Sequence, residues 1–248
     1  MREKIVEIEN LCKHYDKPAG LFSKERIFAL DNLNLYIKRG DIFGLLGPNG
    51  AGKTTMLNII SGLTRQSSGQ VRVLGDNSGL RPKLKKFEIG YLSEENVLPD
   101  YLSLQELLSF LANIFGFNSQ LRAKRIGWLS EQLELASFIN KRIQNLSAGQ
   151  KRLAGLACAF INDPQLLILD EPTVYLDPLG ARKLADLISS FKDQGKTVII
   201  SSHILSQVEK LCGQVAILKR GKLMFYGDIK TLGSKGSLED SFIELTTD

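Results

Sequence analysis

The sequence is poor in cysteine and lacks any apolar run long enough for a membrane-spanning helix. Its three cysteines, Cys12, Cys158 and Cys212, are odd in number and match no metal-site spacing, so reduced thiols of a cytosolic protein are expected. No segment approaches the roughly 18–20 apolar residues of a transmembrane helix. The opening residues, MREKIVEIEN, contain no apolar signal region. If the protein acts at a membrane, we therefore expect another chain to span it.

A large excess of charge of one sign is also absent. The net charge of +5 over 248 residues is mild, and it is more typical of an ordinary solvated surface than of a dedicated anion-binding or lipid-binding one. Apolar residues make up 43% and charged residues 24% of the chain, as in soluble globular proteins. A chain of this length forms one large domain or one domain with an inserted subdomain.

The order of the predicted elements is that of an α/β fold. Alternating apolar residues predict strands near the N-terminus, in KIVEIENL and FALDNLNLYI. Continuous apolar runs predict buried strands in IFGLLG, QLLILD and TVIISS, and amphipathic helical segments separate them. Between residues 102 and 142 the pattern is helical only, and Ser103 and Glu106 form a capping box at its start. We therefore predict a helical insert in this stretch.

A glycine-rich segment, GPNGAGKTT, follows the first buried strand and precedes a helix. It satisfies the P-loop pattern, in which backbone N–H groups surround phosphate, the lysine reaches the β- and γ-phosphates and the next hydroxyl faces Mg²⁺. A glycine-rich turn with a chance Lys-Thr pair would lack this strand–loop–helix context. The predicted phosphate-binding residues are Gly47, Pro48, Asn49, Gly50, Ala51, Gly52, Lys53, Thr54 and Thr55.

Two acids end the buried strand in LLILDEP. Ligands of open α/β sheets bind beyond the carboxyl ends of the strands, so Asp170 is placed to hold Mg²⁺ and Glu171 to orient a water at the γ-phosphate. A solvated acidic turn is the alternative for this segment taken alone. His203 ends VIISSH at the same predicted edge, where its imidazole could donate to the γ-phosphate. A lone histidine at a strand end is otherwise a surface residue.

Five motifs occur in a set order: GPNGAGKTT, LSAGQ, LLILDEP, YLDP and SSH. Together they resemble the nucleotide-binding subunit of an ATP-binding cassette (ABC) transporter, and LSAGQ is the most specific because P-loops occur in many enzyme classes. The resemblance covers residues 4–227 and implies one ABC ATPase domain. Residues 1–93 and 151–227 would form a P-loop NTPase (RecA-like) core with an N-terminal antiparallel β subdomain. Residues 94–150 would form an inserted α-helical subdomain, and residues 228–248 a short tail.

The resemblance also assigns roles to single residues. Tyr15 matches the aromatic residue that stacks on adenine, with Phe22 and Phe28 as competing rings. Asp177 matches the loop that communicates across a dimer of two cassettes. The signature residues, which match those facing the γ-phosphate held by a partner's P-loop, are Ser147, Gly149 and Gln150.

Two positions depart from the family pattern. Ala148 replaces the usual glycine of the signature, which is a common and mild change. After IGYL the family usually has Pro-Gln, and the glutamine contacts Mg²⁺ and the attacking water; here YLSEEN places Glu94 at that position. A glutamate can accept from water or face the metal, but it cannot donate as glutamine does, and it adds negative charge. The implied metal ligands are Thr54, Glu94 and Asp170, and the implied catalytic residues are Lys53, Glu171 and His203.

The function implied by the resemblance is ATP hydrolysis that powers transport, with ATP and Mg²⁺ as cofactors. Two cassettes, as a homodimer or as a heterodimer with a second ABC subunit, would close on ATP at the cytoplasmic face of the cell membrane. They would act on a separate transmembrane permease, through the helical insert and the residues near 98–102. The tail SLEDSFIELT is similar to the ends of subunits paired with ABC-2-type exporters, so export is expected.

Two other functions stay open from the sequence. A soluble ABC-type ATPase acting on nucleic acid or ribosomes usually has a long coiled coil or two cassettes in one chain. This sequence has one set of motifs and a short insert, so we expect no nucleic acid as a partner. A P-loop kinase that phosphorylates a small molecule would leave LSAGQ and Glu171 without a role.

Overall fold

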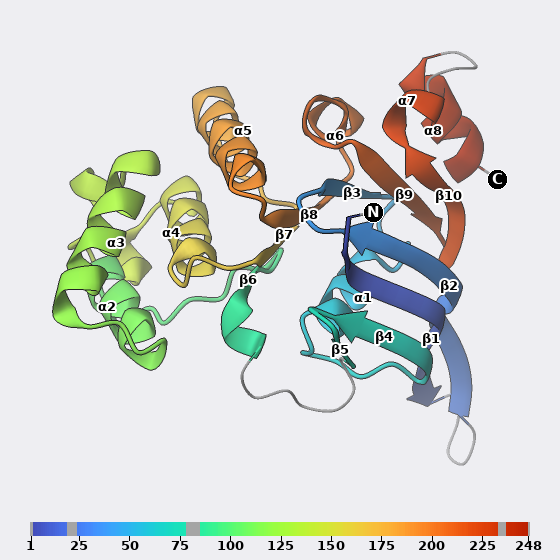
Figure 1. Ribbon diagram of the computed structural model, residues 1–248, viewed down its shortest axis with the longest axis horizontal. Coiled ribbons are helices and arrows are strands. Elements are labelled where there is room, and N and C mark those ends of the chain that lie inside the picture. Colours follow the sequence, from blue (N-terminus) through green and yellow to red (C-terminus); the bar gives the residue numbers. More distant parts are fainter. Residues whose placement is uncertain (1, 19–23, 78–84, 233–236, 248) are drawn as a thin grey trace. The chain divides into compact units, whose positions relative to one another are not determined.

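The computed structural model consists of two compact units (Figure 1). The first contains Met1–Lys86 and Ile199–Asp248, and the second contains Phe87–Val198. The subdomain boundaries expected from the motifs stay a prediction. The residues that the structure describes are 2–18, 24–77, 85–232 and 237–247.

The first unit begins with an antiparallel sheet, as the alternating N-terminal pattern predicts. Its strand order is β2-β1-β4-β5 (Figure 1). Ile8 in β1 lies opposite Leu35 in β2 and Val71 in β4, and all three side chains are buried because alternate residues of a strand point to one face. The strands are β1 (Lys4–Pro18), β2 (Lys24–Lys38), β4 (Ser68–Val73) and β5 (Asp76–Asn77).

A second group of strands in this unit follows the order β10-β9-β3-β8. All five residues of β3 are buried, and β3 runs parallel to β9, as expected for a strand covered on both faces. Strands β9 and β10 form a hairpin, and Arg220 and Gly221 make its two-residue turn with φ of 47° and 78°. The strands are β3 (Ile42–Leu46), β8 (Thr197–Ser202, which begins in the second unit), β9 (Gln214–Lys219) and β10 (Lys222–Asp228). The helices are α1 (Lys53–Ile60), α6 (Leu205–Leu211), α7 (Ile229–Leu232) and α8 (Leu238–Thr246).

The second unit combines a pair of parallel strands with the predicted helical insert. The side chains of Ser103 and Glu106 form the expected capping box at the start of the insert. Within the described residues, no helix has the length and apolar character needed to cross a bilayer. The strands are β6 (Ile89–Leu92) and β7 (Leu166–Asp170), and the α-helices are α2 (Leu104–Ile114), α3 (Ser119–Gln132), α4 (Ala148–Phe160) and α5 (Pro178–Asp193). Short 3₁₀ turns occur at Lys85–Glu88, Leu135–Ser137 and Ile143–Asn145.

Helix α4 packs tightly on its neighbours in this unit. Its Phe160 meets Phe191 of α5 edge to face, with ring centroids 4.7 Å apart. A Cβ on Gly90 of β6 would lie 2.0 Å from the backbone oxygen of Ala159, so only glycine allows strand and helix this close approach. Helix α4 is therefore held against the strand pair that ends in the two predicted acids.

Candidate functional site

The predicted phosphate-binding loop joins β3 to α1 in the first unit. A Cβ on Gly52, whose φ is 104°, would lie 2.5 Å from the backbone oxygen of Ala29, so a larger residue would displace the loop. Lys53 is 7% exposed, and its Nζ donates to the backbone oxygens of Gly47 at 2.7 Å and Pro48 at 3.4 Å. The ammonium therefore lies against the loop that the motif assigns to phosphate.

Helix α1 begins differently from the other described helices of eight or more residues. Helices α2, α3, α4, α5 and α8 each begin with a side chain that accepts from an N–H group of the first turn. Helix α1 begins at Gly52, which has no side-chain cap. A helix N-terminus carries partial positive charge, and its N–H groups can bind an anion. This N-terminus, with the Lys53 ammonium beside it, fits the phosphates of a nucleotide.

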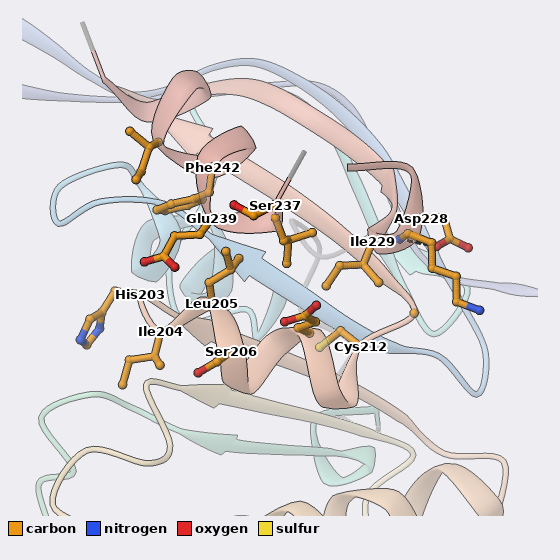
Figure 2. A pocket seen from close by; sticks show the side chains of 15 residues that line it. His203, Ile204, Leu205, Ser206, Cys212, Asp228, Ile229, Ser237, Glu239 and Phe242 are labelled. Atoms are coloured by element: carbon orange, nitrogen blue, oxygen red, sulfur yellow. Dashed lines mark hydrogen bonds between the residues drawn. The ribbon is translucent and has the colours of Figure 1, made fainter. Parts of the chain in front are cut away.

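His203 directly follows β8 in the first unit and is exposed. It lies at one end of a hollow of about 1260 Å³ (Figure 2). Leu205 and Cys212 line this hollow at α6, and Glu239 and Phe242 line it at α8 (Figure 2). Of the predicted site residues in the described part of the chain, His203 alone lines the hollow, so the hollow does not coincide with the phosphate-binding loop.

In the second unit, Asp170 and Glu171 lie where β7 ends. Their exposed fractions are 0% and 4%. Glu171 has a φ of 49°, and this left-handed conformation costs a residue other than glycine roughly 1–2 kcal/mol. Strained backbone of this kind persists only where the surrounding structure holds it, and it occurs often at functional sites. The left-handed φ and the burial together indicate that the surrounding structure fixes the conformation of Glu171.

Arg152 of α4, which the motifs do not single out, holds this backbone in place. Its side chain is 1% exposed, and its N–H groups donate to five backbone oxygens. Burial lowers the pKa of Arg152, and the negative charges of nearby acids, Asp170 first among them, oppose that shift. The acceptors are Asp170 and Glu171 at 2.6 Å each, Pro172 at 3.3 Å, Ser93 at 2.8 Å and Glu94 at 3.1 Å.

The sequence contains one signal for Arg152. It lies on the same face of α4 as Gly155, Leu156 and Ala159, and all of these residues are buried. A cation on the apolar face of a helix is expected to be buried only with partners. The signal does not identify those partners, because they lie in two other segments of the chain.

The signature segment LSAGQ begins helix α4, as its sequence predicts. The Oγ of Ser147 accepts from the backbone N–H of Gln150 at 3.2 Å, and the side chain of Gln150 accepts from the N–H of Ser147 at 3.1 Å. A Cβ on Gly149 would lie 3.0 Å from the backbone oxygen of Tyr175. Asp177 caps α5 in the same manner, with its Oδ1 accepting from the N–H of Gly180 at 2.7 Å. Ser147 and Asp177 are both exposed.

The loop that contains Glu94 follows β6 and is attached to α4. The side-chain amide of Asn96 donates to the backbone oxygen of Lys151 at 2.6 Å. A Cβ on Gly155 would lie 1.9 Å from Oδ1 of Asn96, so a larger residue here would displace the Asn96 side chain. Glu94 itself is exposed. Burial raises the pKa of Tyr91, and the negative charges of Asp170 and Glu94 raise it further, so these two acids act on one region of the unit.

The residue predicted to stack on adenine lies in β1. Tyr15 is 47% exposed, and Lys13 Nζ lies 4.7 Å from the centroid of its ring. Of the competing rings, Phe28 is 53% exposed and packs on His14, with ring centroids 5.9 Å apart. Phe22 lies outside the described residues.

Comparison with known proteins decides the family. Residues 30–174, more than half of the chain, match the profile of the family described as ABC transporter. This chain belongs to the ABC transporter family. The match includes the phosphate-binding loop, the signature segment and both acids of β7. The chain is thus an ABC ATPase, and the resemblance inferred from the motifs is confirmed at this level.

Similar ABC proteins span most of the chain. An uncharacterized ABC transporter ATP-binding protein of Synechocystis is 37% identical over 242 residues, covering 96% of this chain and 67% of its own length. The lantibiotic transport ATP-binding protein SrtF of Streptococcus pyogenes is 36% identical over 220 residues, covering 89% of each chain. The bacterial ABC transporter cassette MJ0796, whose structure is dimeric, is 28% identical with a TM-score of 0.82, covering 90% of this chain and 98% of its own. A second structure of that cassette is a post-hydrolysis state bound to ADP and Pi.

These structures confirm the predicted fold class. The chain is an α/β P-loop NTPase with an antiparallel β subdomain and a helical part.

Proposed function

We propose that this ABC ATPase hydrolyses ATP with Glu171 as general base and uses the cycle to drive a separate transmembrane permease in export. The observation that carries the proposal is the Lys53 ammonium beside an α1 N-terminus without a side-chain cap. A lysine ammonium beside the N–H groups of a helix N-terminus is suited to the negative charge of a nucleoside triphosphate. The buried and strained Glu171 supplies the second element of the chemistry.

Residues of the first unit bind the substrate. The ammonium of Lys53 pairs with the β- and γ-phosphates, and the backbone N–H groups of its loop donate to them. Tyr15 stacks on the adenine ring, which its exposed position in β1 permits. His203 donates to the γ-phosphate. The remaining residues of the binding loop are Gly47, Pro48, Asn49, Gly50, Ala51, Gly52, Thr54 and Thr55.

Residues of both units fit Mg²⁺ by their donor chemistry. Mg²⁺ prefers oxygen ligands and is commonly held by one or two carboxylates together with substrate phosphates. In the described residues no cluster of three His, Cys, Asp or Glu side chains could hold a metal. The ligands proposed from the motifs are the hydroxyl of Thr54 and the carboxylates of Asp170 and Glu94. When bound, Mg²⁺ neutralises charge on the phosphates. Glu171, which is outside this set, accepts a proton from the attacking water.

The signature segment acts on a second copy of the cassette. Ser147 is exposed at the capped start of α4, where its hydroxyl and the neighbouring N–H groups can face an anion. The dimeric structure of the similar cassette MJ0796 supports a homodimer, or a heterodimer with a second ABC subunit. Asp177 is exposed at the start of α5 and belongs to the same proposed interface. Gly149 and Gln150 are the other signature residues that we propose to face the nucleotide of the second copy.

A transmembrane permease is the second proposed partner, and the protein would act at the cytoplasmic face of the membrane. The name of the similar protein SrtF includes lantibiotic transport, which supports export and pairing with an ABC-2-type permease. Val97 and Tyr101, near the predicted contact region, are 82% and 73% exposed. Exposed apolar side chains of this kind suit a protein interface.

A reconstituted pair tests this partnership. In vesicles that contain the permease that copurifies with this chain, we expect ATP turnover to rise several-fold. The exchange Tyr101→Ser should weaken that rise because an apolar interface contact is lost. Turnover of the isolated chain should be the same for Tyr101→Ser and wild type. Stimulation that Tyr101→Ser leaves intact would remove this surface from the interface.

ATP binding by the phosphate-binding loop is tested with Lys53→Ala. A hydrogen bond to a charged group is worth about 1.5–3 kcal/mol, so ATP affinity should fall about 10- to 100-fold, and phosphate release should fall with it. The control is Lys222→Ala, because that exposed lysine pairs only loosely with Asp31, at 3.6 Å. Titration with a fluorescent ATP analogue measures the affinity. Wild-type affinity in Lys53→Ala would contradict the proposed binding mode.

A further inference from the structure

Arg152 donates hydrogen bonds to the backbone oxygens of two loops, and each loop contains a proposed functional acid. A guanidinium has five N–H donors and no acceptor, and Arg152 has five backbone acceptors. Three of these oxygens belong to residues 170–172, where β7 ends, and two belong to residues 93–94, which follow β6. Strands β6 and β7 are parallel neighbours with Leu92 opposite Leu169, so the two loops leave the same end of the strand pair.

The contact with Glu171 is tied to the direction of its side chain. In an extended strand, successive carbonyl groups point to opposite sides, so two consecutive oxygens cannot reach one nitrogen. Here the oxygens of Asp170 and Glu171 both accept from Nη2 of Arg152, each at 2.6 Å, because Glu171 has a left-handed φ of 49°. The same turn of the backbone sets where the Glu171 carboxylate points. A residue that holds these two oxygens therefore also orients the carboxylate.

We propose that Arg152 is a positioning residue for ATP hydrolysis, which holds Glu171 and the Glu94 loop in one arrangement on helix α4. The inference rests on the proposed role of Glu171 as general base. In the part of the chain that the structure describes, every hydrogen bond of Arg152 ends on a backbone oxygen. Arg152 therefore acts through Glu171 and Glu94. Ser147 caps helix α4, so the signature segment and this arginine belong to one helix.

The exchange Arg152→Lys tests the proposal. Lysine retains the charge but has one nitrogen, which cannot reach five oxygens in two loops. We expect kcat to fall about 10- to 100-fold because the general base is misplaced, while KM for ATP stays within about two-fold. A merely structural role would lower the amount of folded protein, or its melting temperature, without this separation of kcat from KM.

Arg125 is the matched control. It is another largely buried arginine of the second unit, and it donates to the backbone oxygens of Phe160 at 2.6 Å and Ile161 at 3.2 Å, at the opposite end of α4. Arg125→Lys removes the same kind of contact without touching either loop. We expect it to lower the melting temperature by a similar amount and to leave kcat within about two-fold of wild type.

A second variant covers the case in which Arg152→Lys does not fold. Arg152→Gln is uncharged and has two amide donors, so it can satisfy part of the cluster. The same fall in kcat at nearly constant KM is expected. Wild-type kcat in either folded variant, or a fall equal to that of Arg125→Lys, would overturn the proposal. Absence of ATP turnover in the wild-type protein would instead overturn the proposed function itself.

Discussion

The exchange Glu171→Gln is expected to lower ATP turnover by about 10²- to 10⁴-fold, the range that a general base contributes to catalysis. Glutamine has the same shape, and the backbone oxygen of Glu171 keeps its bond to Arg152, so the fold should be unaffected. ATP affinity should stay near that of wild type, because the phosphate-binding residues are unchanged. Under our proposal, ATP-bound dimers should then accumulate, since hydrolysis is the step that reopens them. Phosphate release and size-exclusion chromatography with ATP measure both effects.

Glu134→Gln provides a matched control for this exchange. Glu134 belongs to the same unit, also has a left-handed φ, of 52°, and forms a surface ion pair with Lys183. The substitution therefore repeats the chemical change at a similar backbone position away from β7. Turnover of Glu134→Gln should equal that of wild type within about two-fold, because surface ion pairs contribute little. Undiminished turnover in Glu171→Gln would exclude Glu171 as the base.

The exchange Ser147→Ala is expected to leave ATP binding by one chain intact and to prevent closure of two chains on ATP. The hydroxyl of Ser147 caps α4 and, in our proposal, also faces the γ-phosphate held by the partner. Loss of a hydrogen bond to a charged acceptor costs about 1.5–3 kcal/mol, so turnover should fall about 10- to 100-fold. Introduced into Glu171→Gln, the exchange should abolish the accumulated dimer.

The control exchange Ser103→Ala removes a helix cap without removing the proposed contact with the γ-phosphate. Ser103 forms the same kind of capping box at α2, where its Oγ accepts from the N–H of Glu106 at 3.2 Å. Either serine exchange should destabilise the protein by about 1 kcal/mol, the usual value of an N-cap. Only Ser147→Ala should lose turnover. A strictly monomeric form of the chain that hydrolyses ATP at the full rate would show that the signature segment has no partner.

Much of the site could be predicted because its signals are local. The phosphate-binding loop needs a buried strand, glycines at set spacings and a lysine at the start of a helix, and IFGLLGPNGAGKTT contains all three in sequence. The capped helix starts at Ser103 and Ser147 likewise depend on residues three positions apart. The family match confirms the reading of these motifs as those of an ABC ATPase. The roles of the single residues stay predictions.

The sequence by itself therefore determined the α/β class, the family resemblance and the capped helix starts at Ser103 and Ser147. Only the tertiary structure decided that Arg152 lies within hydrogen-bond reach of residues 93–94 and 170–172. The physical reason is that these bonds end on backbone oxygens, which every residue has, so no side chain in either segment signals the contact. Folding of α4 against β6 and β7 brings the three segments together, and it leaves Glu171 in a strained conformation that no local pattern predicts.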